Sequence, residues 1–270
     1  MSFIVKHFKN RIKYWEVWNE ENFNDPNRGA YVQPSLYAPL LNDTYSAIQQ
    51  TNLTAKVLFG GLGSAWKDSS QYFASVYGFL GSARPFDIFA AHPYYGKTYN
   101  QDPQLYMRQP NEMNPGDRTI LDKFVTLMQT NGDGSKKIWT TELGWNSSAG
   151  VPPPCYWVVT EEQQALYLKR GFDILYYEVP AVDKLIWYQY RDTGAAPPCQ
   201  GFAADAGGLP QSGSSFVGSA LVPPGTDGDI NWWFGLYRAN KRDPKFSRCA
   251  FAAWPATCPL YDVFLPIIIR

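Results

Sequence analysis

The sequence has no surplus of charge of either sign, because 24 lysines and arginines balance 24 aspartates and glutamates. This balance offers no electrostatic basis for binding nucleic acid or an anionic membrane surface. Long apolar runs are also missing: none approaches the roughly 18 residues of a membrane span, and the Ile-Ile-Ile of residues 267–269 is far too short. Residues 1–9 lack the apolar core and cleavage site of a signal peptide. We therefore expect neither nucleic acid nor a membrane as a partner, and no signal peptide within this chain.

Cysteine is scarce, and its four positions do not form a metal motif. Cys155, Cys199, Cys249 and Cys258 lack the short paired spacing with histidine that a zinc site needs, so no metal or cofactor is expected. Disulfides are the better interpretation. Cys249 and Cys258 could close a small loop, while Cys155 and Cys199 both lie in proline-rich loops that could be joined. Spacing alone does not choose among the three connectivities that four cysteines allow.

Three N-glycosylation sequons are present, beginning at Asn42, Asn52 and Asn146. Such tripeptides permit glycosylation but also occur by chance. Together with the predicted disulfides, they favour an oxidising, extracellular setting, so we expect a secreted protein.

Aromatic residues are abundant, at 16% of the chain with 10 tryptophans and 18 tyrosines. This composition is expected of a protein that binds uncharged sugars, because the apolar faces of a sugar ring stack on aromatic planes. Core packing is the alternative, and it accounts for several of the ten tryptophans.

Two β-prone runs each end on a glutamate. Residues 14–22 read YWEVWNEEN and deliver Glu20, while residues 137–145 read KIWTTELGW and deliver Glu142. Either glutamate alone is more often a solvated loop residue. Together, and flanked by Trp18 and Trp145, they suggest paired carboxylates in a sugar-binding cleft, the arrangement used for glycoside hydrolysis.

The rest of the chain alternates between strand and helix patterns. This rhythm predicts a single α/β domain over residues 1–270, with a parallel sheet and functional groups at the carboxyl ends of its strands. The expected strands lie near residues 14–20, 56–62, 86–92, 137–142 and 184–190. The expected helices lie near residues 35–51, 70–80, 118–129, 160–177 and 245–254, with long loops at 96–115 and 192–229.

These motifs resemble the second half of a clan A retaining glycoside hydrolase, and most closely glycoside hydrolase family 39 and its relatives. The fourth strand of that barrel ends in Asn-Glu and the seventh in Glu, matching Asn19-Glu20 and Glu142 in type and order. The spacing of 142 − 20 = 122 residues leaves room for two intervening strands. The closing segment, FGLY at residues 234–237 followed by DPKF at 243–246, also resembles the family. The resemblance covers roughly residues 13–254.

The resemblance implies a (β/α)8 TIM-barrel type of fold and assigns roles to individual residues. Glu20 would be the acid/base and Glu142 the nucleophile of a mechanism that retains configuration at the anomeric carbon. Asn19 would bond the sugar 2-hydroxyl, while Tyr94 and His92 would hold and orient Glu142. His92 has a structural core role as its alternative. Trp18 flanks the acid, and Trp145 and Trp187 would form stacking walls, with core packing as the alternative for these two.

Two departures from the family pattern stand out. Glu21 follows the predicted acid where the family usually has proline, and only 13 residues precede Tyr14. Strands one to three, with the second-strand arginine that supports the nucleophile, therefore have no counterpart, and we expect an incomplete barrel of strands four to eight. An open sheet exposes edges and apolar surface. We expect a second copy, a terminal helix or the apolar run at residues 263–269 to cover it.

Two readings of the function remain at this point. The first is a retaining hydrolase of β-linked plant-type oligo- or polysaccharides such as β-glucan or xylan; an inverting mechanism is less favoured. The second is a carbohydrate-binding half-barrel without catalysis, because a truncated site could still stack sugars without aligning two acids for chemistry. The sequence leaves open which sugar is bound and whether cleavage is internal or terminal.

Overall fold

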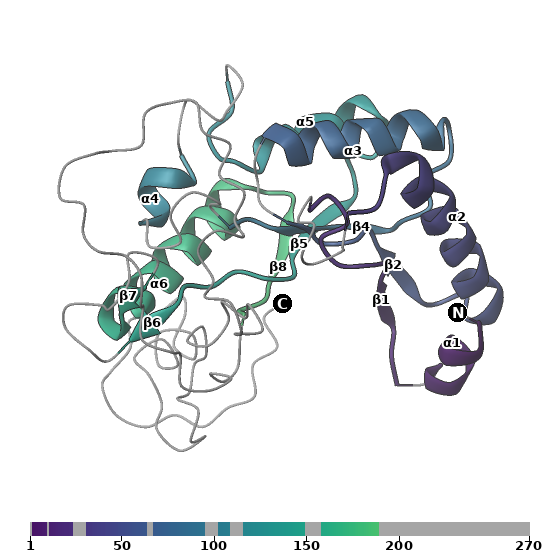
Figure 1. The fold of residues 1–270 in the computed structure, drawn as a ribbon, viewed down its shortest axis with the longest axis horizontal. Helices are drawn as coiled ribbons and strands as arrows, with labels where there is room; N and C mark the ends of the chain where they lie inside the picture. Colours follow the sequence, from purple (N-terminus) through teal and green to yellow (C-terminus); the bar gives the residue numbers. More distant parts are fainter. Residues whose placement is uncertain are drawn as a thin grey trace, which may run out of the picture.

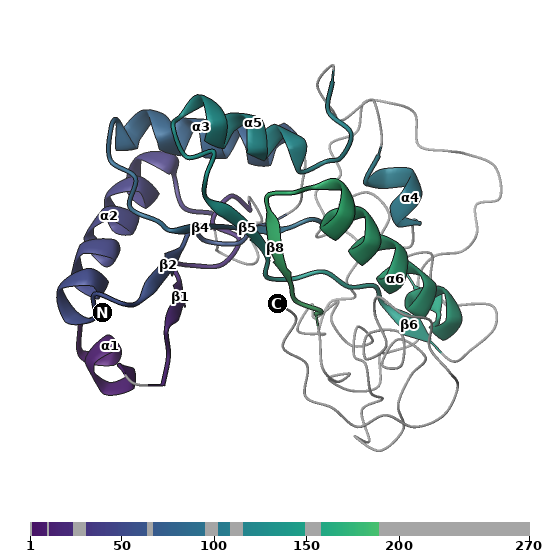
Figure 2. The same cartoon turned by 180° about the vertical axis from the view of Figure 1, so that it is seen from behind.

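A parallel β-sheet, with helices along its outer side, organises the chain in the computed structural model. The structure describes residues 2–9, 11–23, 31–63, 67–94, 102–108, 116–148 and 158–188. The helices follow one another in an arc around the strands, as both views show (Figures 1 and 2). This is the layering expected when each strand is followed by a crossover helix.

The six-stranded sheet has the order β1-β2-β4-β5-β8, with β3 paired to β4, and all its pairs are parallel. Its strands are β1 (Tyr14–Glu16), β2 (Lys56–Leu58), β3 (Leu62–Gly63), β4 (Ile88–His92), β5 (Lys137–Thr140) and β8 (Val182–Leu185). Two further strands, β6 (Ser147–Ser148) and β7 (Val159–Thr160), pair with each other. The helices are α1 (Ser2–Phe8), α2 (Pro34–Thr51), α3 (Lys67–Leu80), α4 (Pro103–Tyr106), α5 (Asp122–Thr130) and α6 (Glu161–Glu178).

The five strands and four of the five helices predicted from the sequence are confirmed, with shifted ends. Helix α5 begins at Asp122 rather than near Arg118, because the Asp122 carboxylate accepts the backbone N–H groups of Arg118 and Thr119 at 2.7 and 3.1 Å. These bonds form a turn before the helix. Helix α6 begins with a capping box, in which Thr160 and Gln163 exchange side-chain to backbone bonds. Helices α1 and α4 were not predicted.

Alternating residues of the strands supply two separate apolar clusters. Val57, Phe89 and Ile138 belong to the large core, where Phe89 packs against Phe73 of α3 and Phe124 of α5 at ring distances of 4.4 and 5.1 Å. Their sequence neighbours form a second cluster on the opposite face of the sheet, made of Leu58, Ile88, Ala90 and Trp139. Both faces of the sheet are therefore buried, as in the parallel sheets of α/β proteins.

The sheet does not close on itself within the described residues, because β1 and β8 each pair on one side only. The expectation that a second copy covers this opening stays a prediction. The apolar run at 263–269, the helix near 245–254, the closing motif at 234–246 and all four cysteines lie outside the described residues. No helix in the described ranges combines the length and apolarity needed to span a bilayer.

The structure also limits which sequons present an accessible amide. Asn52 is 5% exposed and Asn146 is 3% exposed, whereas Asn42 is exposed. The Asn52 side chain donates to the Lys9 carbonyl and accepts from Thr54, so it stabilises the turn that follows α2. Of the three candidates, only Asn42 therefore remains suited to glycosylation in the folded chain.

Two helical glycines provide a matched test of the packing of α6. A Cβ at Gly171 would lie 2.9 Å from Cη2 of the buried Trp145, whereas a Cβ at Gly78 of α3 would meet nothing within 4 Å. We expect Gly171→Ala to destabilise the protein by about 1 to 3 kcal/mol through overpacking. Gly78→Ala should instead stabilise it by about 0.5 to 1 kcal/mol, because alanine favours the helix. Urea unfolding measures both, and equal shifts of the midpoint in one direction would contradict this packing.

Candidate active site

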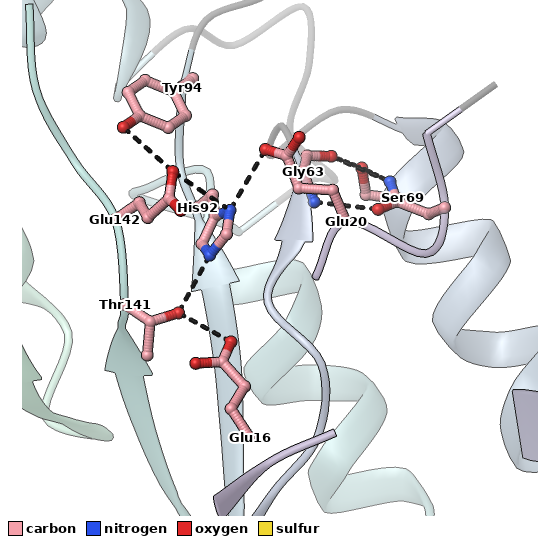
Figure 3. Close-up of polar contacts among 9 residues, drawn as sticks. Glu16, Glu20, Gly63, Ser69, His92, Tyr94, Thr141 and Glu142 are labelled. Carbon is pink, nitrogen blue, oxygen red and sulfur yellow. Dashed lines mark hydrogen bonds and ion pairs between the residues drawn. The ribbon is translucent and has the colours of Figure 1, made fainter. Parts of the chain in front are cut away.

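Polar side chains gather where β1, β4 and β5 end. The parallel register pairs Glu16 with Leu58 and Ala91 with Thr140, so these strands finish at one edge of the sheet. Glu20 follows β1, His92 closes β4 and Glu142 follows β5. The side chains of these three residues point toward one another (Figure 3). The structure thus brings together the three residues that the sequence suggested separately.

His92 lies between the two glutamates. Its Nδ1 atom is 3.2 Å from Oε1 of Glu20 and 3.7 Å from Oε2 of Glu142. Carboxylate oxygens of Glu20 and Glu142 lie within 4.8 Å of each other, and the Tyr94 hydroxyl donates to Oε2 of Glu142 at 3.5 Å. The His92 side chain is 1% exposed, whereas those of Glu20 and Glu142 are 22% and 25% exposed. The two acids are therefore accessible to a ligand, with the imidazole buried behind them.

The segment that carries Glu20 has an unusual backbone. Trp18 and Glu20 adopt positive φ angles of 78° and 52°, which non-glycine residues rarely adopt. Each such residue costs on the order of 1 to 3 kcal/mol and persists only where its surroundings enforce it. Here Asn19 forms a parallel bridge with Gly61, and the Glu20 N–H donates to the Gly61 carbonyl at 2.9 Å. Pairing to the segment after β2 therefore aims the Glu20 carboxylate.

A second set of bonds holds the same segment just beyond the acid. The Asn22 side chain donates to the Gly63 carbonyl at 2.9 Å and to the Ser69 hydroxyl at 3.0 Å. It also accepts the Gly63 N–H at 2.9 Å, and Ser69 donates to the Gly63 carbonyl at 3.0 Å. Figure 3 shows the Gly63 and Ser69 end of this clamp beside Glu20. The clamp fixes the loop to β3 and to the start of α3.

Three glycines after β2 make room for the glutamates. A Cβ at Gly63 would lie 2.9 Å from Cδ of Glu20, and a Cβ at Gly60 would lie 2.2 Å from Oε2 of Glu21. A Cβ at Gly61 would lie 2.2 Å from Nε2 of His92. Sequence reasoning assigned these glycines no role and placed only residues 60 and 61 inside the expected strand near residues 56–62. Three glycines within four residues, opposite an acidic strand end, were the signal that it missed.

Burial and neighbouring charge shift the pKa values of the central groups. Burial raises the pKa of Glu142; the His92 charge and the Tyr94 bond oppose this, while Glu20 and Glu16 add to it. Burial lowers the pKa of His92, but the bond to Glu20 and the charges of Glu142, Glu20 and Glu16 outweigh it, so that the net pKa is raised. Glu142 thus holds its proton to higher pH than a solvated glutamate does.

The aromatic candidates are distributed unevenly. Trp18 is 50% exposed beside Glu20, whereas Trp145 and Trp187 are 2% and 6% exposed. Trp145 packs on Trp187 and Tyr167 at ring distances of 5.9 and 5.8 Å. These contacts fit the core-packing alternative, since two such buried rings offer a sugar little area. Asn19 is exposed next to Glu20, where a ligand could reach it.

The same three residues could surround an ion. Donor atoms of Glu20, His92 and Glu142 all lie within 4.8 Å of one another, and they form a metal-type cluster among the residues that the structure describes. Carboxylate and imidazole donors suit several divalent metals, so donor type alone does not identify one. Two carboxylates and an imidazole at these distances are equally suited to proton transfer.

Two polar residues of the site were missed at the sequence level. The Thr141 hydroxyl donates to Oε1 of Glu16 at 3.0 Å and lies 3.0 Å from Nε2 of His92. A carboxylate inside the aromatic run of β1 was the available signal for Glu16, since strands disfavour acidic residues. Thr141 carried no signal beyond its place before Glu142.

Glu21 occupies a different environment from its neighbour. It is fully buried, and its carboxyl group lies against Gly60 and near the hydroxyl of Tyr37 in α2. That hydroxyl donates to the Val17 carbonyl and accepts the Gly60 N–H. Burial, reinforced by the charges of Glu16 and Glu20, raises the pKa of Glu21 to about 8. At neutral pH it is mostly protonated, so it does not place a full second charge beside Glu20.

Comparison with known proteins points to one class of fold. No family model matches the chain, and no curated protein matches it. A solved family 39 glycoside hydrolase from Bacteroides cellulosilyticus WH2 matches with a TM-score of 0.60 at 21% identity, over 93% of this chain and 42% of that one. A β-xylosidase from Caulobacter crescentus CB15 gives 0.55 at 16%, over 96% and 46%. Xylanase 10B from Thermotoga maritima gives 0.53 at 17%, over 93% and 62%.

At these identities the likeness shows the fold alone. The chain spans less than two thirds of the length of each of these three structures. The α/β fold with a parallel sheet, predicted from the strand and helix rhythm, is confirmed. Membership of family 39 in particular stays a prediction.

Replacement of Glu21 by glutamine tests the buried carboxyl group. Because its folded pKa of about 8 exceeds the unfolded value of 4.5, its contribution to stability is complete below about pH 4.5 and is lost as pH rises to about 8. Glu21→Gln cannot titrate, so we expect it to gain stability relative to wild type by roughly 1 kcal/mol per pH unit across this window. Urea unfolding at pH 5, 6.5 and 8 measures this, with exposed Glu162→Gln as the control. A stability difference independent of pH would refute the assignment.

Proposed function

We propose that this chain forms the catalytic part of a retaining β-glycoside hydrolase with two glutamates. The observation that supports this most directly is the separation of the Glu20 and Glu142 carboxylate oxygens, within 4.8 Å. Retaining enzymes hold their carboxyl groups roughly 5 to 5.5 Å apart, whereas inverting enzymes need roughly 6.5 to 9.5 Å to admit a water molecule. The spacing therefore favours direct attack by a carboxylate on the sugar.

The reaction proceeds in two displacements. Glu142 attacks the anomeric carbon while Glu20 gives its proton to the departing oxygen, which leaves a glycosyl ester on Glu142. Glu20, now a carboxylate, takes a proton from water, and the resulting hydroxide equivalent breaks the ester with retained configuration. The Tyr94 hydroxyl orients Glu142, and His92 contacts both acids. Asn19, exposed beside Glu20, would bond the sugar 2-hydroxyl.

The site and the proteins of similar fold support a substrate class for this proposal. Half-exposed Trp18 offers a stacking plane beside the acid. Solved structures that share the fold include a xylanase and a β-xylosidase. These observations support β-linked plant-type oligo- or polysaccharides, such as xylan or β-glucan, as substrates. Extracellular location would suit this activity.

The proposed architecture is a (β/α)8 barrel type of which β1, β2, β4, β5 and β8 represent strands four to eight. The same open sheet supports the second candidate, a carbohydrate-binding half-barrel without catalysis, because β1 and β8 pair on one side only in the described part of the chain. Association with a second copy would cover the opening. Hydrolysis separates the two candidates, since a pure binding protein shows affinity without release of product.

The nucleophile assignment is tested with aryl β-glycosides of xylose, glucose and glucuronic acid. We expect wild type to cleave at least one of them and to release the β-anomer first, as NMR detects. Glu142→Gln should reduce kcat/KM on the order of a thousandfold, because no carboxylate attacks the sugar. Azide should rescue Glu142→Gly and yield an α-glycosyl azide. Exposed Glu162→Gln is the control, and unchanged turnover in Glu142→Gln would exclude this role.

The pH dependence of kcat/KM tests the environment of Glu142. Since the pKa of Glu142 is raised above 4.5 and the nucleophile must be ionised, we expect the acid limb to lie above pH 4.5. Tyr94→Phe removes a bond that favours the carboxylate, so the limb should move further upward. Tyr176→Phe, at an exposed tyrosine of α6, is the matched control. A downward shift in Tyr94→Phe would contradict the assignment.

A further inference from the structure

A third carboxylate is connected to the acid pair through the buried imidazole. The Thr141 hydroxyl donates to Oε1 of Glu16 at 3.0 Å. The Oγ1 atom of Thr141 also lies 3.0 Å from Nε2 of His92. The opposite ring nitrogen, Nδ1, faces Glu20 and Glu142. Figure 3 shows the continuous row of contacts from Glu16 to the two acids.

Strand register brings these residues to one face of the sheet. Side chains two residues apart share a face, so His92 follows Ile88 and Ala90, and Thr141 follows Trp139. Glu16 pairs with Leu58, which belongs to the same second cluster as Ile88, Ala90 and Trp139. The row therefore lies on the face of the sheet that carries the second cluster, next to the ends of β1, β4 and β5, and Glu16 at its far end is exposed.

Gly61 is what allows the row to form. A Cβ at this position would lie 2.2 Å from Nε2 of His92 and 2.6 Å from Oε1 of Glu16. Contacts this short cannot be accommodated without moving one of the two groups. The absence of a side chain at residue 61 thus leaves space for the Glu16, Thr141 and His92 contacts.

Counting protons gives the row a direction. A threonine hydroxyl has one hydrogen, and an ionised carboxylate only accepts. If Thr141 gives its hydrogen to Glu16, its oxygen can only accept from His92, so Nε2 must carry a proton. A proton at Nδ1 is then the second proton of an imidazolium, which is released near neutral pH. If Nε2 carried no proton, a proton on Nδ1 would instead be the single proton of a neutral imidazole, which is not released near neutral pH.

The charged and titratable groups that face His92 come from every neighbouring segment. Glu16 comes from β1, Glu20 from the loop after it, Glu142 from the loop after β5, and Tyr94 follows His92 itself. Three of the four are carboxyl groups. The hydrogen bond to Glu20 and the charges of Glu142, Glu20 and Glu16 together outweigh burial and raise the pKa of His92, which favours a proton shared between Nδ1 and Glu20.

We propose that Glu16 is a positioning residue that acts through Thr141 to hold the Nε2 proton of His92, and so keeps the proton between Nδ1 and Glu20 transferable. This inference rests on the proposed hydrolase function. In the first displacement the shared proton leaves with the departing oxygen; in the second, water restores it. Glu16 touches neither the sugar nor the reacting atoms.

Substrates that differ in leaving group separate this role from a structural one. We expect Glu16→Leu and Thr141→Val to reduce kcat/KM for phenyl β-xyloside about tenfold or more, because its leaving group needs the proton. For 2,4-dinitrophenyl β-xyloside, whose leaving group departs without one, the loss should stay below about threefold. If wild type prefers another sugar, the same aryl pair of that sugar is used. Equal losses on both substrates would overturn the proposal.

Conservative variants then test the hydrogen-bond direction against charge alone. Glu16→Gln keeps an oxygen that accepts from Thr141 but removes the charge, and Thr141→Ser keeps the hydroxyl. Both should restore most of the rate on phenyl β-xyloside relative to Glu16→Leu and Thr141→Val. A loss in Glu16→Gln as large as in Glu16→Leu would show that charge matters rather than proton placement, and would refute the proposal.

A spectroscopic measurement decides the proposal even without turnover. The chain has only two histidines, so His7→Gln leaves the ¹⁵N imidazole signals of His92 alone. At a pH where the ring is neutral, we expect the Nε2–H form in this background and a shift toward Nδ1–H with Thr141→Val or Glu16→Leu. An Nδ1–H form in the parent, or no change in the variants, would overturn it. Absence of glycoside cleavage with the expected tautomers would instead reject only the hydrolase function.

Discussion

The position of the buried His92 ring constrains the whole site. Its side chain is 1% exposed, yet both nitrogens meet polar atoms, from carboxylates on one side and a threonine hydroxyl on the other. An imidazole buried without such partners would be costly, because burial penalises its charged form. Because the ring is closely surrounded, the strands that deliver Glu20, Glu142 and Thr141 must end at the same level along the sheet.

Glycine and an unusual backbone meet these requirements together. Gly60, Gly61 and Gly63 let three acidic side chains approach the segment after β2, and the positive φ of Glu20 turns its carboxylate toward the histidine. Such strained residues are typical of functional sites, where the surroundings compensate for their cost. The Asn22 clamp provides that compensation here. The backbone that carries Glu20 is therefore fixed by hydrogen bonds to Gly61 and Gly63.

The adjacent glutamates Glu20 and Glu21 lie in opposite environments. Glu20 faces the accessible edge of the sheet, whereas Glu21 turns into the core beside Tyr37, where burial raises its pKa to about 8. A neutral carboxyl group can be buried at a cost that a charged one cannot. For this reason Glu21, although next to Glu20, does not add a further full negative charge near His92 at neutral pH.

Local patterns in the sequence determined the strands, most of the helices and the two glutamates, because hydrophobic periodicity and strand-end polarity are properties of neighbouring residues. Glu16, Thr141 and the glycines depend on which strands lie side by side, and that is decided by pairing across up to 125 residues of chain. The burial of Trp145 and Glu21 was likewise decided by tertiary packing, since a single sequence position does not reveal what covers it. The sequence by itself therefore specified the elements and the acid pair, whereas only the packed sheet decided their partners, since those contacts join residues distant along the chain.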